Sequence, residues 1–160
     1  MKTLVLGLGN DLYGDDGVGC QVVQQLMEER EAGKARWASL EEVGMEACGL
    51  SGLKLLDVIE GYDRVIIIDT IKKDDPVTGR ISVLKGSELR HIPGPSVHYI
   101  SIPQAIDIGR KAGLEVPTEI DIIAVEAKNL YHMGEGLTDE MIQAIPEIIQ
   151  TLQKLLEIHD

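Results

Sequence analysis

Two adjacent carboxylates, Asp15 and Asp16, follow a glycine-rich segment near the amino end of the chain. The segment VLGLGNDLYGDDGVG (residues 5–19) begins like a buried strand and turns at Gly7 and Gly9 toward a helix. Acidic side chains at the start of a helix oppose phosphate binding, because they cancel the positive end of the helix dipole. The pair therefore either caps the helix in the ordinary way or presents a carboxylate to a cation.

A third acid and one histidine have positions that suit the same chemistry. Asp69 closes the apolar run VIIID, and His98 precedes a helix expected to begin near Ser101. Ligands of open parallel sheets bind outside the carboxyl ends of the strands, where Asp16 and Asp69 approach each other if the first and third strands are neighbours. Two carboxylates and one imidazole would give a divalent transition metal an incomplete shell with open positions. A turn cap at Asp69 and a structural histidine at position 98 are the ordinary alternatives.

Strand and helix patterns alternate along the chain. Strands are expected at residues 3–9, 35–43, 64–71, 80–86 and 119–127, and helices at 15–31, 51–62, 101–113 and 138–159. The β-branched run at 64–71 predicts a strand that is buried on both faces. The alternation of polar and apolar residues at 80–86 predicts an edge strand, which could run either parallel or antiparallel to its neighbour. Together they predict an α/β fold, a three-layer α/β/α sandwich with a mostly parallel sheet of about five strands, in a single domain over residues 1–160.

Several residues within the predicted helices have expected roles. Gly19 should let the first helix lie close to the sheet. Ser101 through Gln104 has capping-box spacing, with Pro103 in the first turn. Thr138 is expected to cap the last helix. The residues expected to be buried are Ile102, Ala105 and Ile106 in the helix at 101–113 and Met141, Ile142, Ile145, Ile149, Leu152 and Leu156 in the last helix.

Composition excludes several classes of partner. The chain of 160 residues has 15 basic and 27 acidic residues and a formal net charge of -12, which argues against nucleic acid and anionic membranes. No apolar run approaches the roughly 18 residues of a membrane span, and the amino end lacks a signal-type run. We expect a cytoplasmic protein without membrane insertion, in which Cys20 and Cys48 are small buried thiols.

Five segments resemble the hydrogenase maturation endopeptidases. They are, in order along nearly the whole chain, LVLGLGN, LYGDDGVG, LLDVIEGYDRVIIIDTI, SVHYISIPQAI and GEGLT. The resemblance implies an α/β/α sandwich and an endopeptidase that removes a C-terminal extension from the [NiFe]-hydrogenase large-subunit precursor after nickel insertion. The metal-binding and catalytic positions of the family fall on Asp16, Asp69 and His98. The nickel would be supplied by the precursor, the partner of the protein, and no organic cofactor is implied. Asp15 is then expected to cap the helix.

The chain departs from the family pattern at three places. Many members have glutamate where Asp16 stands, so the ligand is displaced here by about one methylene. The D-(G/C)-G-T loop of many members is matched by ACGL at residues 47–50, without Asp or Thr. Glu46, Cys48 and Gly49 are therefore candidates for this substrate loop, with Glu46 as a partial substitute for the missing aspartate. The segment AVEA at 124–127 replaces a GxQP ending and indicates a different subgroup.

The sequence contains no recognisable side-chain nucleophile. No serine stands in a G-x-S-x-G motif, and neither cysteine belongs to a recognisable Cys–His catalytic motif. We therefore expect metal-assisted hydrolysis at the nickel of the precursor, with the general base left open. Two alternatives remain: a nickel-checking chaperone that does not cleave, and a nucleotide-binding Rossmann-like protein. The second is disfavoured because the glycine spacing is GxGxxxxG and not GxGxxG.

Overall fold

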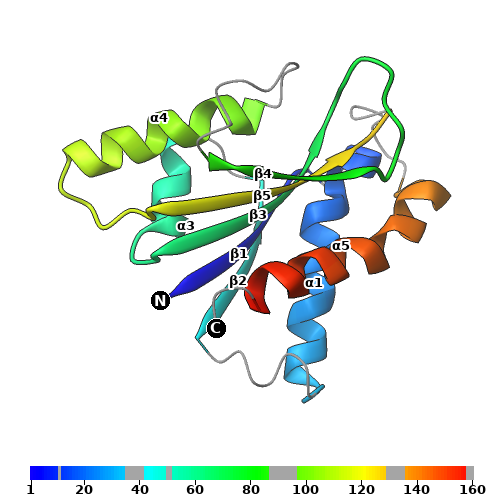
Figure 1. Ribbon diagram of the computed structural model, residues 1–160, viewed down its shortest axis with the longest axis horizontal. Coiled ribbons are helices and arrows are strands. Elements are labelled where there is room, and N and C mark those ends of the chain that lie inside the picture. The colour runs from blue at the N-terminus through cyan, green and yellow to red at the C-terminus, as the bar shows by residue number, and fades with distance from the viewer. Residues whose placement is uncertain (11, 35–41, 50–51, 87–96, 129–135, 158–160) are drawn as a thin grey trace.

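The computed structural model describes residues 1–10, 12–34, 42–49, 52–86, 97–128 and 136–157, without the side chains of 97–101 and 103. The strands are β1 (Thr3–Leu8), β2 (Val43–Cys48), β3 (Arg64–Ile71), β4 (Ile81–Lys85) and β5 (Glu119–Glu126). They form one sheet in the order β2-β1-β3-β5-β4, parallel except for β4, which pairs antiparallel with β5 (Figure 1). The prediction of a mostly parallel sheet with an edge strand at 80–86 is confirmed.

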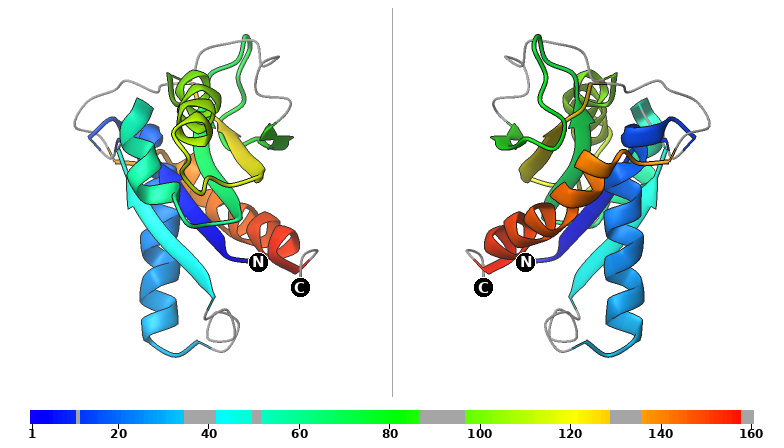
Figure 2. Two further views of the ribbon diagram at one scale, coloured as in Figure 1. Left: turned by 90° about the vertical axis from the view of Figure 1, so that its left-hand side faces the viewer. Right: turned by 90° about the vertical axis from the view of Figure 1, so that its right-hand side faces the viewer.

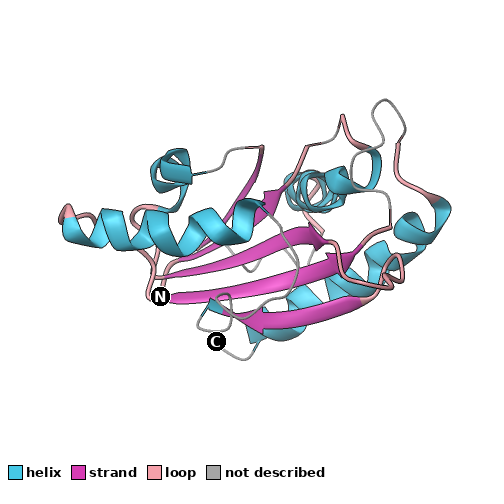
Figure 3. Cartoon of the chain, turned by 90° about the horizontal axis from the view of Figure 1, so that it is seen from above, coloured by secondary structure: helices cyan, strands magenta, loops and turns pink. Residues whose placement is uncertain are grey.

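Helices cover both faces of the sheet. They are the short 3-10 turn η1 (Gly14–Gly17) with α1 (Val18–Glu31), the turn η2 (Gly52–Leu55) with α3 (Leu56–Ile59), α4 (Val97–Lys111) and α5 (Asp139–Glu157). Figure 2 shows α1 and α5 on one side of the sheet and α3 and α4 on the other, and Figure 3 shows the same layers from above. The expected three-layer sandwich is therefore the observed fold. Among the described residues no helix is long and apolar enough to cross a bilayer.

The central strand β3 supplies both hydrophobic layers. All eight of its residues are buried. Ile66 and Ile68 belong to the core beneath α1 and α5, whereas Val65 and Ile67 belong to the core beneath α3 and α4. This alternation is the period-two geometry of a strand, and it explains why the run RVIIIDTI has no polar face.

The prediction for the second strand is wrong. The strand was expected at residues 35–43, but β2 spans Val43–Cys48, and residues 35–41 lie outside the described part of the chain. Among the described strands, β2 lies at the edge of the sheet and pairs with β1 alone, and Met45 is its one buried residue. Such a strand needs little apolar patterning, and the glycine at position 44 weakens the strand signal further.

The fourth helix begins earlier than its sequence signals predict. A start at Ser101 with Pro103 in the first turn was expected, but α4 begins at Val97, so His98 lies within the first turn and not in a preceding loop. The inward-facing residues Ile102, Ala105 and Ile106 are buried as predicted. The capping-box spacing at residues 101–104 was therefore a false start signal inside a continuing helix.

The last helix is capped as expected and is described to Glu157. The hydroxyl of Thr138 accepts a hydrogen bond from the amide of Met141 at 3.3 Å, the position of an N-cap contact. The assignment of Ile142 to the buried stripe is wrong, since it is 49% exposed. Ile148 and Leu155 are buried instead, because the stripe drifts around the helix with its 3.6-residue period.

A buried ion pair closes the amino edge of the sheet, where the parallel strands begin. Arg64 and Asp121 are 1% and 2% exposed, and Nε and Nη2 of Arg64 donate to one carboxylate oxygen of Asp121 at 2.9 and 2.6 Å. Nη1 of Arg64 donates to the carbonyl of Leu155 in the last turn of α5 at 3.0 Å, and Lys85 donates to the other oxygen of Asp121. Burial alone would raise the pKa of Asp121, but hydrogen bonds from Lys85 and Arg64 and their charges hold that pKa below 3.8, the usual value.

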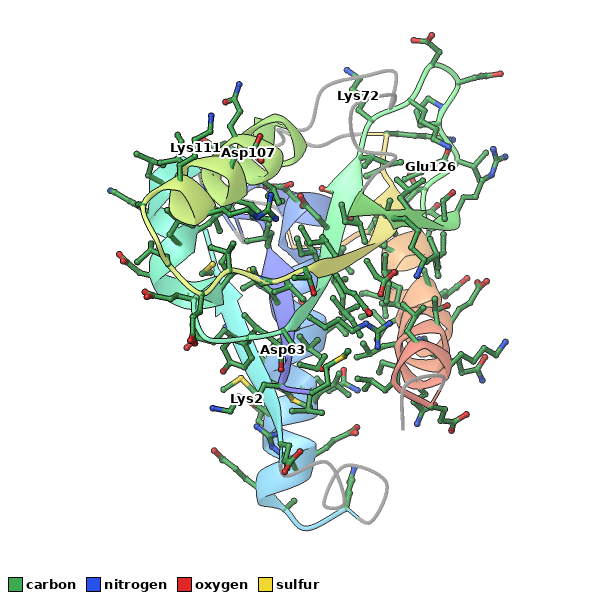
Figure 4. All side chains as sticks on the ribbon, turned by 60° about the vertical axis from the view of Figure 1, so that its left-hand side comes forward. Lys2, Asp63, Lys72, Asp107, Lys111 and Glu126 are labelled. Carbon is green, nitrogen blue, oxygen red and sulfur yellow. The ribbon has the colours of Figure 1, made fainter. Side chains whose placement is uncertain are left out.

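The chain also begins at the amino edge. Met1 is 62% exposed, and the backbone amide of Lys2 donates to the carboxylate of Asp63 at 2.7 Å. Figure 4 shows Lys2 and Asp63 together at this end of the molecule, with Lys72 and Glu126 at the opposite end. The carboxyl edge, where the predicted site residues Asp16 and Asp69 lie, therefore faces away from the first residues of the chain.

Candidate functional site

Glycines bring the first motif close to the sheet. Gly9 follows β1 with a φ of 141°, and a Cβ there would lie 1.9 Å from the carbonyl oxygen of Asp16. On Gly19, in the first turn of α1, a Cβ would lie 2.3 Å from the carbonyl oxygen of Ile68 in β3. The helix therefore rests on the backbone of the sheet, as expected from Gly19. Asp16 is consequently placed beside the ends of β1 and β3.

Asp16 is half-buried and is held by two neutral donors. The backbone amide of Asn10 donates to Oδ2 at 2.9 Å, and the hydroxyl of Thr70 donates to Oδ1 at 2.8 Å. Neither contact neutralises the carboxylate charge. The side chain is thus oriented by the protein at a position that solvent partly reaches.

Asp69 is fully buried near the end of β3, which spans Arg64–Ile71 as predicted. Oδ1 of Asp69 accepts a hydrogen bond from the backbone amide of Thr70 at 2.8 Å. Thr70 therefore contacts both acids, Asp69 through its amide and Asp16 through its hydroxyl. The strands that carry the two motifs are neighbours, with Gly7 of β1 beside Ile68 of β3, as the hypothesis required.

The position of the third predicted ligand is known only for its backbone. His98 lies in the first turn of α4, and its side chain lies outside the described part of the structure. Within that described part, no group of three His, Cys, Asp or Glu side chains could hold a metal ion. The convergence of His98 with Asp16 and Asp69 therefore stays a prediction.

Asp15 does not cap the helix that it precedes, so that expectation is wrong. Neither η1 nor α1 has a side-chain cap. Asp15 is 2% exposed, and its Oδ1 accepts a hydrogen bond from the backbone amide of Thr138 at 2.8 Å. The Thr138 hydroxyl lies 3.0 and 3.2 Å from its two oxygens. The acid thus joins the first motif to the start of α5, a contact that local capping rules do not consider.

The candidate substrate loop lies beside the glycine motif. Glu46 is exposed on β2, Cys48 is half-buried at its last residue, and Gly49 is exposed directly after it. The amide of Gly9 donates to the carbonyl of Cys48 at 3.4 Å. The Cys20 thiol from α1 donates to the carbonyls of Gly9 and Cys48 at 3.5 and 3.8 Å. Cys20 is buried as predicted, and it links the two segments.

The unusual glutamate in the AVEA segment holds the connection between β3 and β4. Glu126 is fully buried, and its Oε1 accepts a hydrogen bond from the amide of Val77 at 3.3 Å. Its Oε2 pairs with Nε of Arg80 at 3.7 Å and has no hydrogen-bond partner within the described residues. The amide of Gly79 donates to the carbonyl of Glu126 at 2.8 Å. The departure from the family pattern therefore shapes the loop at this edge of the sheet.

The sequence analysis missed two threonines of the site. Thr70 follows Asp69 directly, and a polar residue within a strand buried on both faces was an available signal. Thr138 was recognised as a cap, but its contact with Asp15 spans 123 residues and has no local signature. Both threonines orient an acid of the first motif.

The sheet order and the acids at its carboxyl edge define an α/β/α protein with a candidate cation-binding edge. A family model described as hydrogenase maturation protease matches residues 20–155. The chain therefore belongs to the hydrogenase maturation protease family, as the resemblance of its motifs indicated.

Individual relatives cover nearly the whole chain. The hydrogenase 2 maturation protease of Escherichia coli is 27% identical over an alignment of 161 positions that covers 98% of this chain and 92% of that protein. The hydrogenase expression/formation protein HupD of Bradyrhizobium diazoefficiens is 28% identical over an alignment of 161 positions that covers 98% of this chain and 79% of that protein. The structure of the hydrogenase maturating endopeptidase HybD from E. coli superposes with a TM-score of 0.74 at 25% identity, covering 99% of this chain and 94% of that one.

Proposed function

We propose that this protein is an endopeptidase that removes the C-terminal extension from the nickel-loaded precursor of a [NiFe]-hydrogenase large subunit. Membership of the hydrogenase maturation protease family supports hydrolysis of a hydrogenase precursor. The observation that carries the proposal for the site is the pair of acids joined by Thr70, Asp16 through the hydroxyl and Asp69 through the amide. The hydrogen-bond donors to Asp16 within the described residues are neutral, which supports a role of that side chain as a contact for a cation.

The nickel belongs to the substrate in this proposal. Asp16, Asp69 and His98 would contact the metal in the precursor and thereby test whether it has been inserted. Docking on the metal would place the scissile peptide bond beside it, so that attack by water becomes effectively intramolecular. The water oxygen adds to the carbonyl carbon, the C–N bond breaks, and the departing amine takes a proton. A metal ion beside the carbonyl assists this step by polarising the C=O bond or activating the water.

The location of the protein is also a proposal. We place it in the cytoplasm, and the low cysteine content, Cys20 and Cys48 far apart in sequence and outside any CxxC motif, supports a reducing compartment. The precursor would be met there as a separate folded chain.

The test compares nickel-loaded and nickel-free precursor. Incubation with the purified protein, followed by mass spectrometry of the precursor, should show loss of the extension only when nickel is present. Casein and short peptides should not be cleaved. His98→Ala should abolish cleavage because it removes one contact to the nickel. The melting temperature of the variant should change little. Efficient trimming of metal-free precursor under chelator would contradict the role of nickel, and binding without cleavage would favour a nickel-checking module.

A further inference from the structure

A buried carboxylate of the first motif is not used by the proposed chemistry. Asp15 is 2% exposed, and its oxygens accept hydrogen bonds from the amide and hydroxyl of Thr138. Both of its oxygens are thus held by a single residue at the start of α5, an element that carries none of the three proposed metal contacts. Its neighbour Asp16 carries the cation-facing role, so the function of Asp15 must lie in what it holds.

The two acids anchor one 3-10 turn in two directions. Within η1 (Gly14–Gly17), Asp15 bonds to Thr138 at the start of α5, and Asp16 bonds to Thr70 near the end of β3. The turn makes tight backbone contact with Gly9, where no side chain fits. With both carboxylates bound, the turn has little freedom to rotate, and the position of the Asp16 oxygens is fixed.

The hydroxyl of Thr138 is oriented by a second contact. Its oxygen accepts a hydrogen bond from the amide of Met141 at 3.3 Å, so its proton is available to Asp15. The three groups thus form a chain of hydrogen bonds in which the Met141 amide donates to the Thr138 hydroxyl and the Thr138 hydroxyl donates to the Asp15 carboxylate. Such a chain couples the start of α5 to the motif that carries Asp16.

We propose that the Asp15–Thr138 contact is a latch that positions Asp16 for the precursor's nickel, and that both are positioning residues. This inference rests on the proposed function for its catalytic consequence. Its structural part, the coupling of Thr138 to the position of Asp16, can be tested without substrate. The alternative is that the contact only stabilises the first turn of α5.

The decisive variant is Thr138→Val, which removes the hydroxyl and keeps the size and the backbone amide. Thr138→Ser is the conservative variant. Thr151→Val is the matched control, since within the described residues the hydroxyl of Thr151 donates to the carbonyl of Glu147 in the same helix, at 2.8 Å. Asp15→Asn gives a second way to weaken the latch if Thr138→Val does not fold, because it removes the charge at nearly constant shape.

Amide hydrogen exchange separates the latch from a simple cap. The amide of Asn10 reports on Asp16, because it donates to the Asp16 carboxylate, whereas the amides of Met141 and Ile142 report on the first turn of α5. Thr138→Val should raise exchange at Asn10 about tenfold relative to β3 amides, and Thr138→Ser and Thr151→Val should not. Faster exchange confined to the α5 amides, in Thr138→Val or in Asp15→Asn, would overturn the latch.

Kinetics with nickel-loaded precursor test the consequence for catalysis. Thr138→Val should lower kcat about tenfold with KM within twofold of the wild type, and Thr138→Ser should restore it, because a positioning defect acts on the reacting geometry. An unchanged kcat despite faster exchange at Asn10 would overturn positioning. Absence of cleavage by the wild-type protein would instead refute the proposed function, and the exchange result would still decide whether the latch exists.

Discussion

The two edges of the sheet both contain buried acids, but they treat the charge differently. At the amino edge, Asp121 is enclosed by the cations Arg64 and Lys85. At the carboxyl edge, Asp15 and Asp16 accept hydrogen bonds from amides and hydroxyls, all of them neutral, among the described residues. The first arrangement balances its charge within the protein, whereas the second orients its carboxylates and leaves their charge in place.

The difference separates a structural ion pair from a site prepared for a cation. Within the described residues, Asp16 has neutral hydrogen-bond donors and no cationic partner, whereas Glu126 at the same edge pairs with Arg80. A carboxylate that is oriented without a cation of the protein suits a cation from outside. The proposed nickel of the precursor is such a cation. Changes at the carboxyl edge should therefore reduce activity more than stability, and changes at the amino edge should do the reverse.

The largest effect is expected for Asp69→Asn. The substitution is nearly isosteric, and its amide oxygen can still accept the hydrogen bond from the Thr70 amide. The melting temperature should stay within a few degrees, while processing of nickel-loaded precursor should fall about 1,000-fold, as expected when a charge that stabilises the reacting complex is lost. Rates from mass spectrometry decide this. A normal rate would make Asp69 a turn cap and remove it from the site.

At the amino edge, Arg64→Met should reverse that pattern. Removing one partner of a buried pair leaves Asp121 undercompensated and the Leu155 carbonyl without its guanidinium donor. The free energy of unfolding should fall by about 3 kcal/mol, measured by urea denaturation. Processing per folded molecule should be unchanged.

Lys85→Met is the matched control for that variant. It removes the other cation of the same carboxylate, but the Lys85 side chain is 57% exposed, so the expected loss is below about 1 kcal/mol. Equal losses in Arg64→Met and Lys85→Met would show that burial does not set the strength of the pair.

The smallest effect concerns acid unfolding. The pKa of Asp121 is lower in the folded protein than its usual 3.8, so the unfolded chain binds the proton more readily. The ion pair therefore stabilises the folded state above pH 3.8, and this stabilisation is lost as the pH falls through the lowered pKa of Asp121 in the folded protein. In Asp121→Asn, the free energy of unfolding should therefore decline less steeply with acid below pH 3.8. If the free energy of unfolding declined equally steeply below pH 3.8 in the wild type and in Asp121→Asn, the decline would come from other carboxylates.

The sequence predicts the elements whose signals are local and dense. The β-branched run of β3, the helical spacing of α1 and the cap at Thr138 each contain enough information within a few residues, and all are observed. The edge strand β2 was misplaced because it pairs with one neighbour and is only partly buried, so its sequence needs few apolar residues. Element type is thus predictable where burial is two-sided, and less so at an edge.

The site was predictable in its acids but not in their partners. Asp16 and Asp69 were identified because they lie near the carboxyl ends of two strands that doubly wound sheets place side by side. The partner of Asp15 was missed, because Thr138 lies 123 residues away and capping rules consider only neighbours. Hydrogen-bond partners that depend on packing between distant segments are fixed by the fold as a whole. They cannot be derived from spacing.

The exposed first residue at the amino edge has a practical consequence for binding experiments. Met1 is 62% exposed, and its neighbour Lys2 lies beside Asp63 at the amino edge of the sheet (Figure 4). Asp16 and Asp69 lie at the carboxyl edge, toward the opposite ends of β1 and β3. A short tether at Met1 would hold the protein on a sensor surface with the carboxyl edge turned toward the solution. Precursor flowing over such a surface would meet the acids directly, so immobilisation in this orientation leaves the candidate site accessible.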